Sequence, residues 1–374
     1  MARTLKSDRM LFGATLALVA TGVVMVYSAS AVRPGTLDQP SYQILFRQLA
    51  WVGLGLLLLL GIMRVDYHEF RRPVVIWSVL GVTALALVAV FFFPPRNNTY
   101  RWIAIRSLTF QPSELAKLAA LLFSAALLER RMHRVNDVAY ALVPIGMVTL
   151  GLAGLIVNEP DFGTAAVIVL VVTALVFAAG LSYRYLFGTL LVMLPVAMIF
   201  ILTSPYRLRR TLAFLDPWSD QFGDGYQAVQ SFLAVGSGGV FGKGLMDGVQ
   251  KLSYLPEPHN DFIFAVIGEE LGLVGTTAIL LVFAVIAWRG LRTALVAPDR
   301  FGSLLALGLT MMVVIQALVN LSMVIGLLPT KGIPLPFLSS GGSSLVVNLV
   351  AVGVLLNISQ QSSPVAVGSL EARG

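Results

Sequence analysis

The chain contains 374 residues with a formal net charge of +7, and 57% of its residues are hydrophobic while only 12% are charged. This composition excludes an ordinary soluble globular protein. The chain has no cysteine, which excludes disulfides and thiolate chemistry. We assign the excess positive charge to the loops on one side of a membrane and predict no nucleic-acid partner from it.

Ten apolar segments are predicted to cross the membrane as helices, each close to the roughly 20 residues that a span requires. In chain order they are residues 11–31, 44–63, 73–93, 112–128, 138–157, 163–180, 185–203, 262–288, 302–327 and 341–358. Strict alternation of apolar and polar residues is absent, so a helical bundle is favoured over a β-barrel. We therefore expect an all-α polytopic membrane protein with about ten transmembrane helices.

The distribution of Lys and Arg predicts the orientation of these helices. With the N-terminus in the cytoplasm, the inner segments hold more than twice as many basic residues as the outer segments other than the long loop. An even number of spans then places both termini in the cytoplasm and the large loop 204–260, between helices 7 and 8, on the extracytoplasmic side. The first apolar run resembles a signal peptide, but it has span length and further spans follow, so we expect an uncleaved helix. We expect one membrane domain over residues 1–374, with a short interfacial helix at 227–235.

The most informative motif, Tyr254-Leu-Pro-Glu-Pro-His-Asn-Asp-Phe262, closes the long loop and opens the eighth span. Glu257, His259 and Asp261 meet here at a membrane surface, where ionisable groups in so apolar a chain indicate function. The prolines exclude a regular helix before Asp261, so a structural alternative makes Asp261 the N-cap of the following helix. The Glu-x-His-x-Asp spacing also suits a divalent cation, although irregular backbone leaves the ligand geometry unconstrained.

A second motif, Gln111-Pro-Ser-Glu-Leu-Ala-Lys117, begins the fourth span. Glu114 and Lys117 are three residues apart and share one face of the helix. They either line a polar cavity open to the outer leaflet or form a pair whose charges offset the cost of burial. Glu269 and Glu270 lie well inside the eighth span and require polar partners in the bundle.

Two further groups have structural interpretations that we favour over functional ones. Glu159 and Asp161 lie in a short outer turn, where solvated carboxylates are expected. The glycine-rich segments 236–244 and 339–344 are able to cradle phosphate through backbone amides. Tight turns or close helix packing are the favoured roles for these glycines.

Taken together, the motifs resemble the SEDS family (shape, elongation, division, sporulation) of membrane glycosyltransferases that build peptidoglycan. The motifs are VYSAS at 26–30, RWI at 101–103, FQPSELAK at 110–117, EPDFG at 159–163, GYQ at 225–227, GSGG at 236–239, LPEPHNDFIF at 255–264, GEELG at 268–272, LPTKG at 328–332 and SGGSS at 340–344. GEELG and LPTKG are closer to the division branch than to the elongation branch, and the sporulation branch is a further alternative. Ser340 and Asn260 stand where the family usually has Tyr and Thr, but neither departure removes an ionisable group.

The resemblance implies polymerisation of lipid II, the undecaprenyl-pyrophosphate-linked disaccharide-pentapeptide, into β-1,4 glycan strands at the outer face of the cytoplasmic (inner) membrane. Asp261 matches the family's proposed catalytic aspartate and would be the general base for the acceptor hydroxyl. The expected substrate-binding residues are Glu114, Lys117, Arg101, Glu257, His259 and Arg210.

Positive charge is needed at the departing pyrophosphate. Lys117 with Glu114 is the preferred source, because the two match the family's cavity pair. The alternatives are Arg101, Arg106, the basic cluster 207–210, or a divalent cation. No cofactor is firmly indicated; a divalent cation, Mg or Mn, would lie near Glu257 and Asp261.

Family members work with a class B penicillin-binding protein transpeptidase, and division members also join regulators of the division complex. The resemblance therefore implies these partners, together with lipid II and membrane lipids, and a location at the division septum. An elongation- or sporulation-type member with the same chemistry, a lipid II flippase and a division scaffold without catalysis are the alternatives. Substituting Asp261→Asn separates them, because only the glycosyltransferase needs the base.

Overall fold

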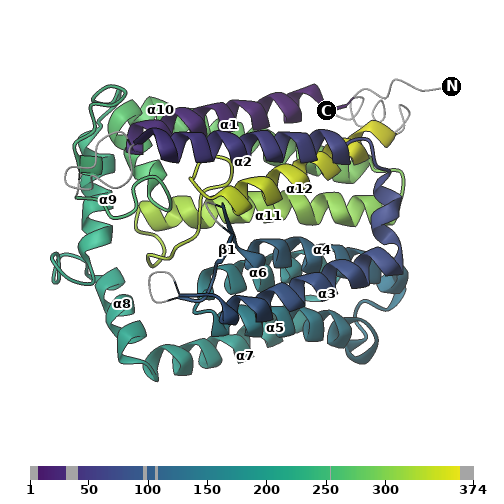
Figure 1. The fold of residues 1–374 in the computed structure, drawn as a ribbon. Helices are drawn as coiled ribbons and strands as arrows, with labels where there is room; N and C mark the ends of the chain where they lie inside the picture. The colour runs from purple at the N-terminus through teal and green to yellow at the C-terminus, as the bar shows by residue number, and fades with distance from the viewer. Residues whose placement is uncertain (1–6, 31–40, 96–98, 106–107, 253, 363–374) are drawn as a thin grey trace.

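The computed structural model describes residues 7–30, 41–95, 99–105, 108–252 and 254–362, which are almost entirely helical (Figure 1). The helices are α1 (Arg9–Ser30), α2 (Ser41–Ile62), α3 (Pro73–Ala89), α4 (Pro112–Arg131), α5 (Val143–Asn158), α6 (Phe162–Ala178), α7 (Tyr183–Leu202), α8 (Pro205–Leu215), α9 (Tyr226–Ser237), α10 (Ile263–Val296), α11 (Arg300–Val324) and α12 (Gly342–Gln361). Short 3-10 or π turns extend or join them at Tyr67–Arg71, Val90–Phe92, Met132–Arg134, Val138–Leu142 and Gln250–Leu252.

Each of the ten predicted spans corresponds to a helix, which confirms the prediction of an all-α polytopic membrane protein. Within the described ranges, seven helices are long and apolar enough to cross a membrane: α1, α2, α3, α5 with the turn before it, α10, α11 and α12. The other three predicted spans correspond to α4, α6 and α7. The short helix expected at 227–235 is α9, which confirms that a helix forms there, whereas its position at the membrane interface stays a prediction.

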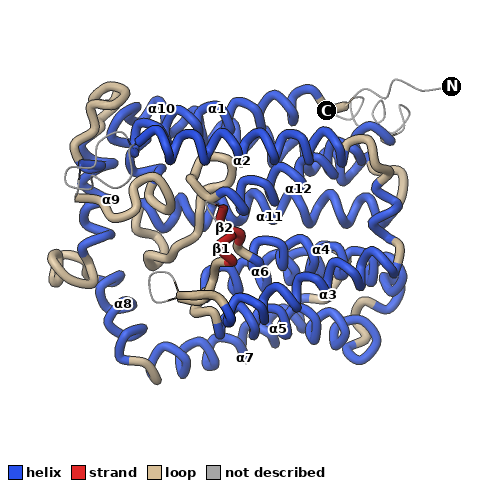
Figure 2. The backbone as a smooth tube through the Cα atoms, viewed as in Figure 1, coloured by secondary structure: helices blue, strands red, loops and turns tan. Residues whose placement is uncertain are grey.

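The helices run roughly alongside one another in two groups, with α1, α2, α10, α11 and α12 in one and α3 to α6 in the other (Figures 1 and 2). In the first group α12 packs against α2, and α10 packs against α1 and α11. In the second group α4 packs against α3 and α6, and α4 and α6 also contact α11, which joins the groups. Helix α7 lies along the edge of the bundle, and α8 leads from it across one end towards α9 (Figure 1).

A small antiparallel hairpin of β1 (Ile103–Ile105) and β2 (Leu108–Phe110) precedes α4. Its register pairs Ile103 with Phe110 and Ile105 with Leu108. Strand β2 leads directly into α4, which begins at Pro112, where a missing amide hydrogen carries no penalty. The hairpin thus brings Arg101 and the first turn of α4 to the same end of the bundle.

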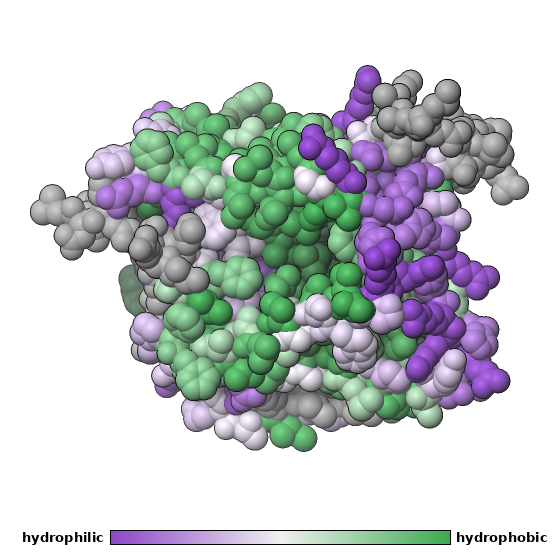
Figure 3. Space-filling view, turned by 45° about the vertical axis from the view of Figure 1, so that its right-hand side comes forward, coloured by the Kyte–Doolittle hydropathy of each residue, from purple (hydrophilic) through white to green (hydrophobic). Residues whose placement is uncertain are grey.

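The two ends of the bundle differ in character. We call the end where α1 begins and α12 ends the basic end; Figure 3 shows hydrophilic side chains gathered along it, next to an apolar surface over the helices. The opposite end, which we call the loop end, carries the hairpin, α8, α9 and Asp261. The positive-inside rule predicts that the basic end faces the cytoplasm and the loop end the outside.

One predicted span is not continuous. Helix α10 is broken at Gly272, whose φ is 65°, and the glycine-rich part of the long loop lies in the break. The amide of Leu273 donates to the carbonyl of Gly239 at 2.9 Å, so the interrupted backbone stays hydrogen-bonded inside the bundle. A Cβ atom on Gly242 would lie 2.1 Å from the carbonyl oxygen of Glu270. Close packing therefore explains these glycines, as expected from the sequence.

The polar partners expected for Glu269 and Glu270 are present, but most of them come from the loop. Both glutamates are fully buried. Lys243 Nζ lies 2.7 Å from a carboxylate oxygen of Glu269, and Lys251 Nζ lies 2.7 Å from one of Glu270. Ser28 of α1 donates a 2.7 Å hydrogen bond to Glu270. The long loop is therefore anchored inside the bundle by charge as well as by packing.

Candidate active site

Asp261 lies at the loop end, just before α10. The N-cap of α10 is Phe262, which has no capping side chain, so the alternative that made Asp261 the helix cap is wrong. The carbonyl oxygen of Asp261 accepts a 2.8 Å hydrogen bond from Nδ2 of Asn320, which also donates to the carbonyl of Ile333 at 2.7 Å. Asn320 thereby ties Asp261 to the connection between α11 and α12.

The carboxylate of Asp261 is partly buried against Gly332. A Cβ atom on Gly332 would lie 3.1 Å from Oδ2 of Asp261 and 4.0 Å from Nη1 of Arg101, so the glycine leaves room for both groups. The pKa of Asp261 is raised to about 7, chiefly by burial and then by the charges of Glu257 and Asp161, while the charge of Arg101 opposes them. A carboxyl group that titrates near neutral pH is matched to general acid–base catalysis.

Arg101 connects this carboxylate to the turn between α5 and α6. Its Nε donates to the carbonyl of Glu159 at 3.3 Å, and its Nη2 donates to the carbonyl of Pro160. Its Nη1 lies 3.9 Å from Oδ1 of Asp161. Three contacts to one turn hold the guanidinium group in place beside Asp261.

The carboxylates of this turn are not solvated, so the expectation that Glu159 and Asp161 are exposed turn residues is wrong. Asp161 is 2% exposed and accepts hydrogen bonds from Gln111 (2.9 Å), Ser113 (3.3 Å) and, as the N-cap of α6, the amide of Thr164 (3.3 Å). Glu159 is fully buried, and its carboxylate oxygens have no hydrogen-bond partner among the described residues. Burial, followed by the charge of Asp161, raises the pKa of Glu159 to about 8, so its side chain is neutral at pH 7.

Positive charges converge on Phe162, the first residue of α6. Lys331 Nζ lies 5.5 Å from the centre of the Phe162 ring, and the guanidinium carbon of Arg207 lies 5.6 Å from it. Burial lowers the pKa of Lys331, and the charges of Arg210, Arg101 and Arg207 lower it further. Three arginine side chains are therefore within electrostatic range of Lys331. Such a cationic cluster, next to the candidate base, suits an anionic group such as a pyrophosphate.

Arg101 and Arg210 were expected in the site from the sequence, whereas Lys331, Asn320 and Asp161 were not. The position of Lys331 could have indicated a role in the site, because it is a lone lysine in an outer loop of a chain whose basic residues lie mostly on the other side of the membrane. Asn320 lies inside an apolar helix, and nothing in the local pattern indicates which loop it holds. Arg106, one of the alternatives for leaving-group charge, lies outside the described residues.

Glu257 and His259 lie beside Asp261 but differ in exposure. The side chain of Glu257 is 47% exposed and that of His259 is 8% exposed, with 3.7 Å between Oε2 and Nε2. Asn260 donates a 2.7 Å hydrogen bond to Glu257. The amide of Ser340 donates to the carbonyl of His259 at 2.9 Å, and Oγ of Ser339 donates to that of Asn260 at 2.7 Å. The two departures from the family pattern, Asn260 and Ser340, therefore lie in one contact region.

Glu114 and Lys117 form a buried ion pair in α4, with 2.7 Å between Nζ and Oε2. Lys117 also donates to Gln316 of α11, and Gln316 donates to the carbonyl of Pro334 at 2.9 Å. This arrangement agrees with the interpretation of a pair whose charges offset burial. It also links α4 to the loop that carries Lys331, whereas a role in substrate binding stays a prediction.

The described residues contain no group of three or more His, Asp or Glu side chains placed to hold a metal ion. The charge of Glu257 is, after burial, the next cause of the raised pKa of Asp261, so the two carboxylates are within electrostatic range of each other. Mg²⁺ is commonly bound through one or two carboxylates together with substrate phosphates. These two residues therefore fit an ion that binds with the substrate, rather than one held by the protein alone.

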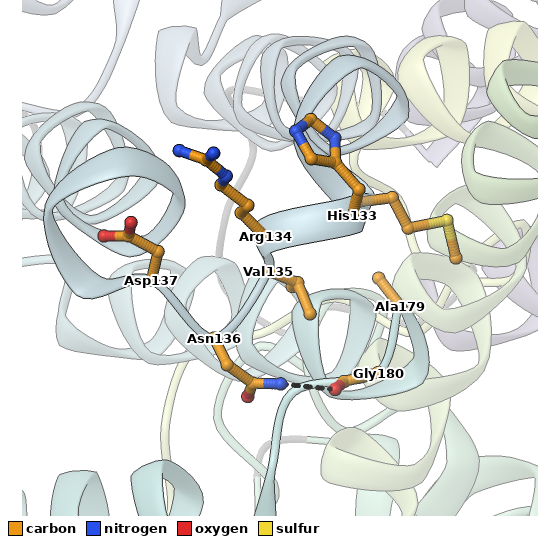
Figure 4. Close-up of a pocket in the computed structure, with 8 residues that line it drawn as sticks. His133, Arg134, Val135, Asn136, Asp137, Ala179 and Gly180 are labelled. Carbon is orange, nitrogen blue, oxygen red and sulfur yellow. Dashed lines mark hydrogen bonds between the residues drawn. The ribbon is translucent and has the colours of Figure 1, made fainter.

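A cavity of about 650 Å³ lies at the basic end, where α4 and α6 end, and so at the opposite end from Asp261. Figure 4 shows its lining, including the hydrogen bond from Asn136 to the carbonyl of Gly180. None of the predicted site residues lines it. The cavity is separate from the candidate active site.

The fold and the site define a polytopic membrane protein with a carboxyl group of raised pKa and a cationic cluster at one end of the helical bundle. The family model described as "Cell cycle protein", which covers FtsW, RodA and SpoVE, matches residues 8–364. The chain belongs to this FtsW/RodA/SpoVE family, which confirms the resemblance drawn from the sequence motifs.

Individual relatives agree with this assignment. The chain is 41% identical over 360 residues to stage V sporulation protein E of Bacillus subtilis, covering 95% of this chain and 97% of that protein. It is 43% identical over 349 residues to the probable peptidoglycan glycosyltransferase FtsW of Geobacter sulfurreducens, covering 92% of each.

Solved structures share the fold over nearly the whole chain. A chain from a peptidoglycan synthase complex, described as coordinating polymerization and crosslinking, matches with a TM-score of 0.79 and 30% identity, covering 96% of this chain and 99% of that chain. The rod shape determining protein RodA of Thermus thermophilus matches with a TM-score of 0.71 and 29% identity, covering 96% and 98%.

Proposed function

We propose that the chain is a peptidoglycan glycosyltransferase of the FtsW type, which polymerises lipid II at the outer face of the cytoplasmic membrane during cell division. Several relatives over most of its length are named peptidoglycan glycosyltransferase FtsW. The observation that carries the proposal is the position of Asp261, whose pKa is raised to about 7, beside a cluster of four basic side chains.

The reaction requires a base for the acceptor hydroxyl and positively charged groups that stabilise the negative charge on the leaving pyrophosphate. Asp261 takes the proton from the acceptor 4-hydroxyl as its oxygen bonds to the anomeric carbon of the donor. The bond from that carbon to the pyrophosphate oxygen breaks, and the configuration inverts from α to β. Lys331, Arg210, Arg207 and Arg101 neutralise the charge on the departing pyrophosphate.

This assignment shifts the preferred source of positive charge from Lys117 to Lys331. Lys117 is already paired with Glu114 and hydrogen-bonded to Gln316, so we assign it to positioning α4 against α11. A divalent cation bound with the substrate at Glu257 and Asp261 would add further positive charge at the pyrophosphate.

We also propose a class B penicillin-binding protein as partner and the division septum as location. The support for the partner is the match to a chain of a peptidoglycan synthase complex in which polymerization and crosslinking are coordinated. The support for the septum is the similarity to FtsW proteins, together with the division-type motifs GEELG and LPTKG.

The test uses purified protein in liposomes with labelled lipid II, with and without the cognate transpeptidase. Wild type should produce glycan ladders and Asp261→Asn should produce none, while both keep the same melting temperature. Polymer from the variant at the wild-type rate would refute the base assignment. Protein-dependent transfer of lipid II across the bilayer without any polymer would instead identify a flippase.

A further inference from the structure

The segment that carries Lys331 is a tight turn held against α11. The amide of Ile333 donates to the carbonyl of Lys331 at 2.9 Å, which places Gly332 at the tip of the turn. At one end of the turn, the amide of Lys331 donates to Sδ of Met323 at 3.0 Å. At the other end, the carbonyl of Ile333 accepts a 2.7 Å hydrogen bond from Nδ2 of Asn320. Asn320 and Met323 are three residues apart on one face of α11, so the turn has a fixed position on this helix.

Asn320 also reaches the segment of the candidate base. Its Nδ2 carries two hydrogens and lies 2.8 Å from the carbonyl oxygen of Asp261, so one amide group joins two segments that are far apart in the sequence. The side chain is fully buried, and its Oδ1 has no hydrogen-bond partner among the described residues. A buried oxygen without a partner lowers stability. The two donated hydrogen bonds therefore explain why an amide stands at this position.

These two hydrogen bonds determine where the base lies relative to the turn. The carboxylate of Asp261 is so close to the turn that a Cβ atom on Gly332 would lie 3.1 Å from its Oδ2. Lys331, which the proposed function assigns to the departing pyrophosphate, is the next residue of the same turn. Proton transfer to Asp261 accompanies the departure of the pyrophosphate in the proposed reaction, so the rate depends on the relative position of these two groups.

We propose that Asn320 is a positioning residue for glycan synthesis, because it holds the backbone of Asp261 and the turn of Lys331 in the relative position that the transfer step requires. It acts through the backbone of both segments and not through contact with the substrate. The inference rests on the proposed function, since it takes Asp261 as the base.

Kinetic measurements on Asn320→Ala in liposomes with labelled lipid II test the proposal. The substitution leaves both carbonyls without their donor, so the value of kcat/KM on the high-pH plateau should fall by about tenfold to a hundredfold. Asp261 should also become more hydrated when it is no longer held against the turn. Burial is the chief cause of its raised pKa, so the midpoint of the pH profile should move below about 7. A structural role alone would reduce the amount of folded protein and leave the midpoint unchanged.

The matched control is Asn357→Ala. Asn357 is also buried in a helix, α12, and also joins backbone groups of another segment. Its Nδ2 donates to the carbonyl of Met63 at 3.0 Å, and its Oδ1 accepts from the amide of Tyr67 at 3.0 Å. These contacts lie at the basic end, far from Asp261. The control should lower the melting temperature as Asn320→Ala does, but the plateau per folded molecule and the midpoint should stay as in wild type.

A second variant, Asn320→Asp, guards against misfolding of Asn320→Ala. Aspartic acid has nearly the same shape and leaves no cavity, but it donates one hydrogen bond at most, so its plateau should also lie below that of wild type. A wild-type plateau in both Asn320 variants would overturn the proposal, as would a lower plateau with an unmoved midpoint in Asn320→Ala. Absence of polymer from wild type would refute the proposed function and this inference with it, whereas polymer from wild type and unaffected variants would refute the inference alone.

Discussion

The raised pKa of Asp261 predicts how glycan synthesis depends on pH, and two substitutions should shift this dependence in opposite directions. A base acts in its deprotonated form, so glycan synthesis should rise with pH through about 7, the pKa of Asp261. The charge of Glu257 raises this pKa and that of Arg101 lowers it. Glu257→Gln should therefore move the rise in activity to lower pH, and Arg101→Gln should move it to higher pH.

The size of the first shift follows from the exposure of Glu257. A pair in which one partner is 47% exposed is well screened, and exposed pairs contribute about 0.2–1 kcal/mol. Since 1.36 kcal/mol corresponds to one pH unit, the midpoint should fall by about 0.2–0.7. The charge of Arg101 affects the pKa of Asp261 less than that of Glu257 does, so Arg101→Gln should produce the smaller displacement, in the opposite direction.

The assay measures initial rates of polymer formation from labelled lipid II between about pH 5.5 and 8.5, at concentrations well below KM, because the pH profile of kcat/KM reports the pKa of the free enzyme. Two exposed loop residues provide controls of matched charge, Asp216→Asn and Arg209→Gln, and neither should move the midpoint. Arg101→Gln is also expected to slow the reaction, so the midpoint and not the rate is the readout. Shifts of the same sign in both test variants would show that Asp261 is not the titrating group.

Glu270→Gln should destabilise the protein by about 3–5 kcal/mol, because it leaves the Lys251 ammonium buried without its partner; a lower melting temperature in detergent, partly restored by Glu270→Gln/Lys251→Met, would confirm it. Glu159→Gln should keep its activity. The folded-state pKa of Glu159 lies above that of the unfolded chain, so wild type loses stability as pH rises from about 4.5 through about 8. The variant should lose less between these pH values, and identical melting profiles would contradict a neutral Glu159. Lys331→Met should raise the KM for lipid II about tenfold with partial rescue by Lys331→Arg, whereas an unchanged KM in radiolabel assays would remove Lys331 from the pyrophosphate site.

The spans were predictable because an apolar run of about 20 residues is a local property of the sequence. Asp261 stood out for a similar reason, since a carboxylate between a proline-rich loop and an apolar helix is unusual, although its assignment as the base came from the family resemblance. The burial of Glu159 and Asp161 was not, because a short turn between two helices looks solvated until the fold places Arg101 and Gln111 over it.

The break in α10 is a second feature that the local sequence pattern did not predict. The residues that follow Gly272 are as apolar as those of any span, and glycine is common in membrane helices. What interrupts the helix is a loop more than twenty residues away that supplies the missing hydrogen bonds. The part of Lys331 in the cationic cluster was missed for the same reason, since Lys331 and Arg207 are far apart in the sequence and meet only at Phe162.

The anchoring of the long loop has a consequence for biogenesis. The loop is synthesised and exported before α10 enters the bilayer, so Glu269 and Glu270 must insert before Lys243 and Lys251 reach them. A carboxylate at the centre of a helix costs about 3 kcal/mol at the translocon. The N-terminal part of α10, next to Asp261, is therefore expected to reach its final position only when the loop packs against it and forms these ion pairs. Newly made chains should therefore bind substrate only some time after all their helices have been inserted into the membrane.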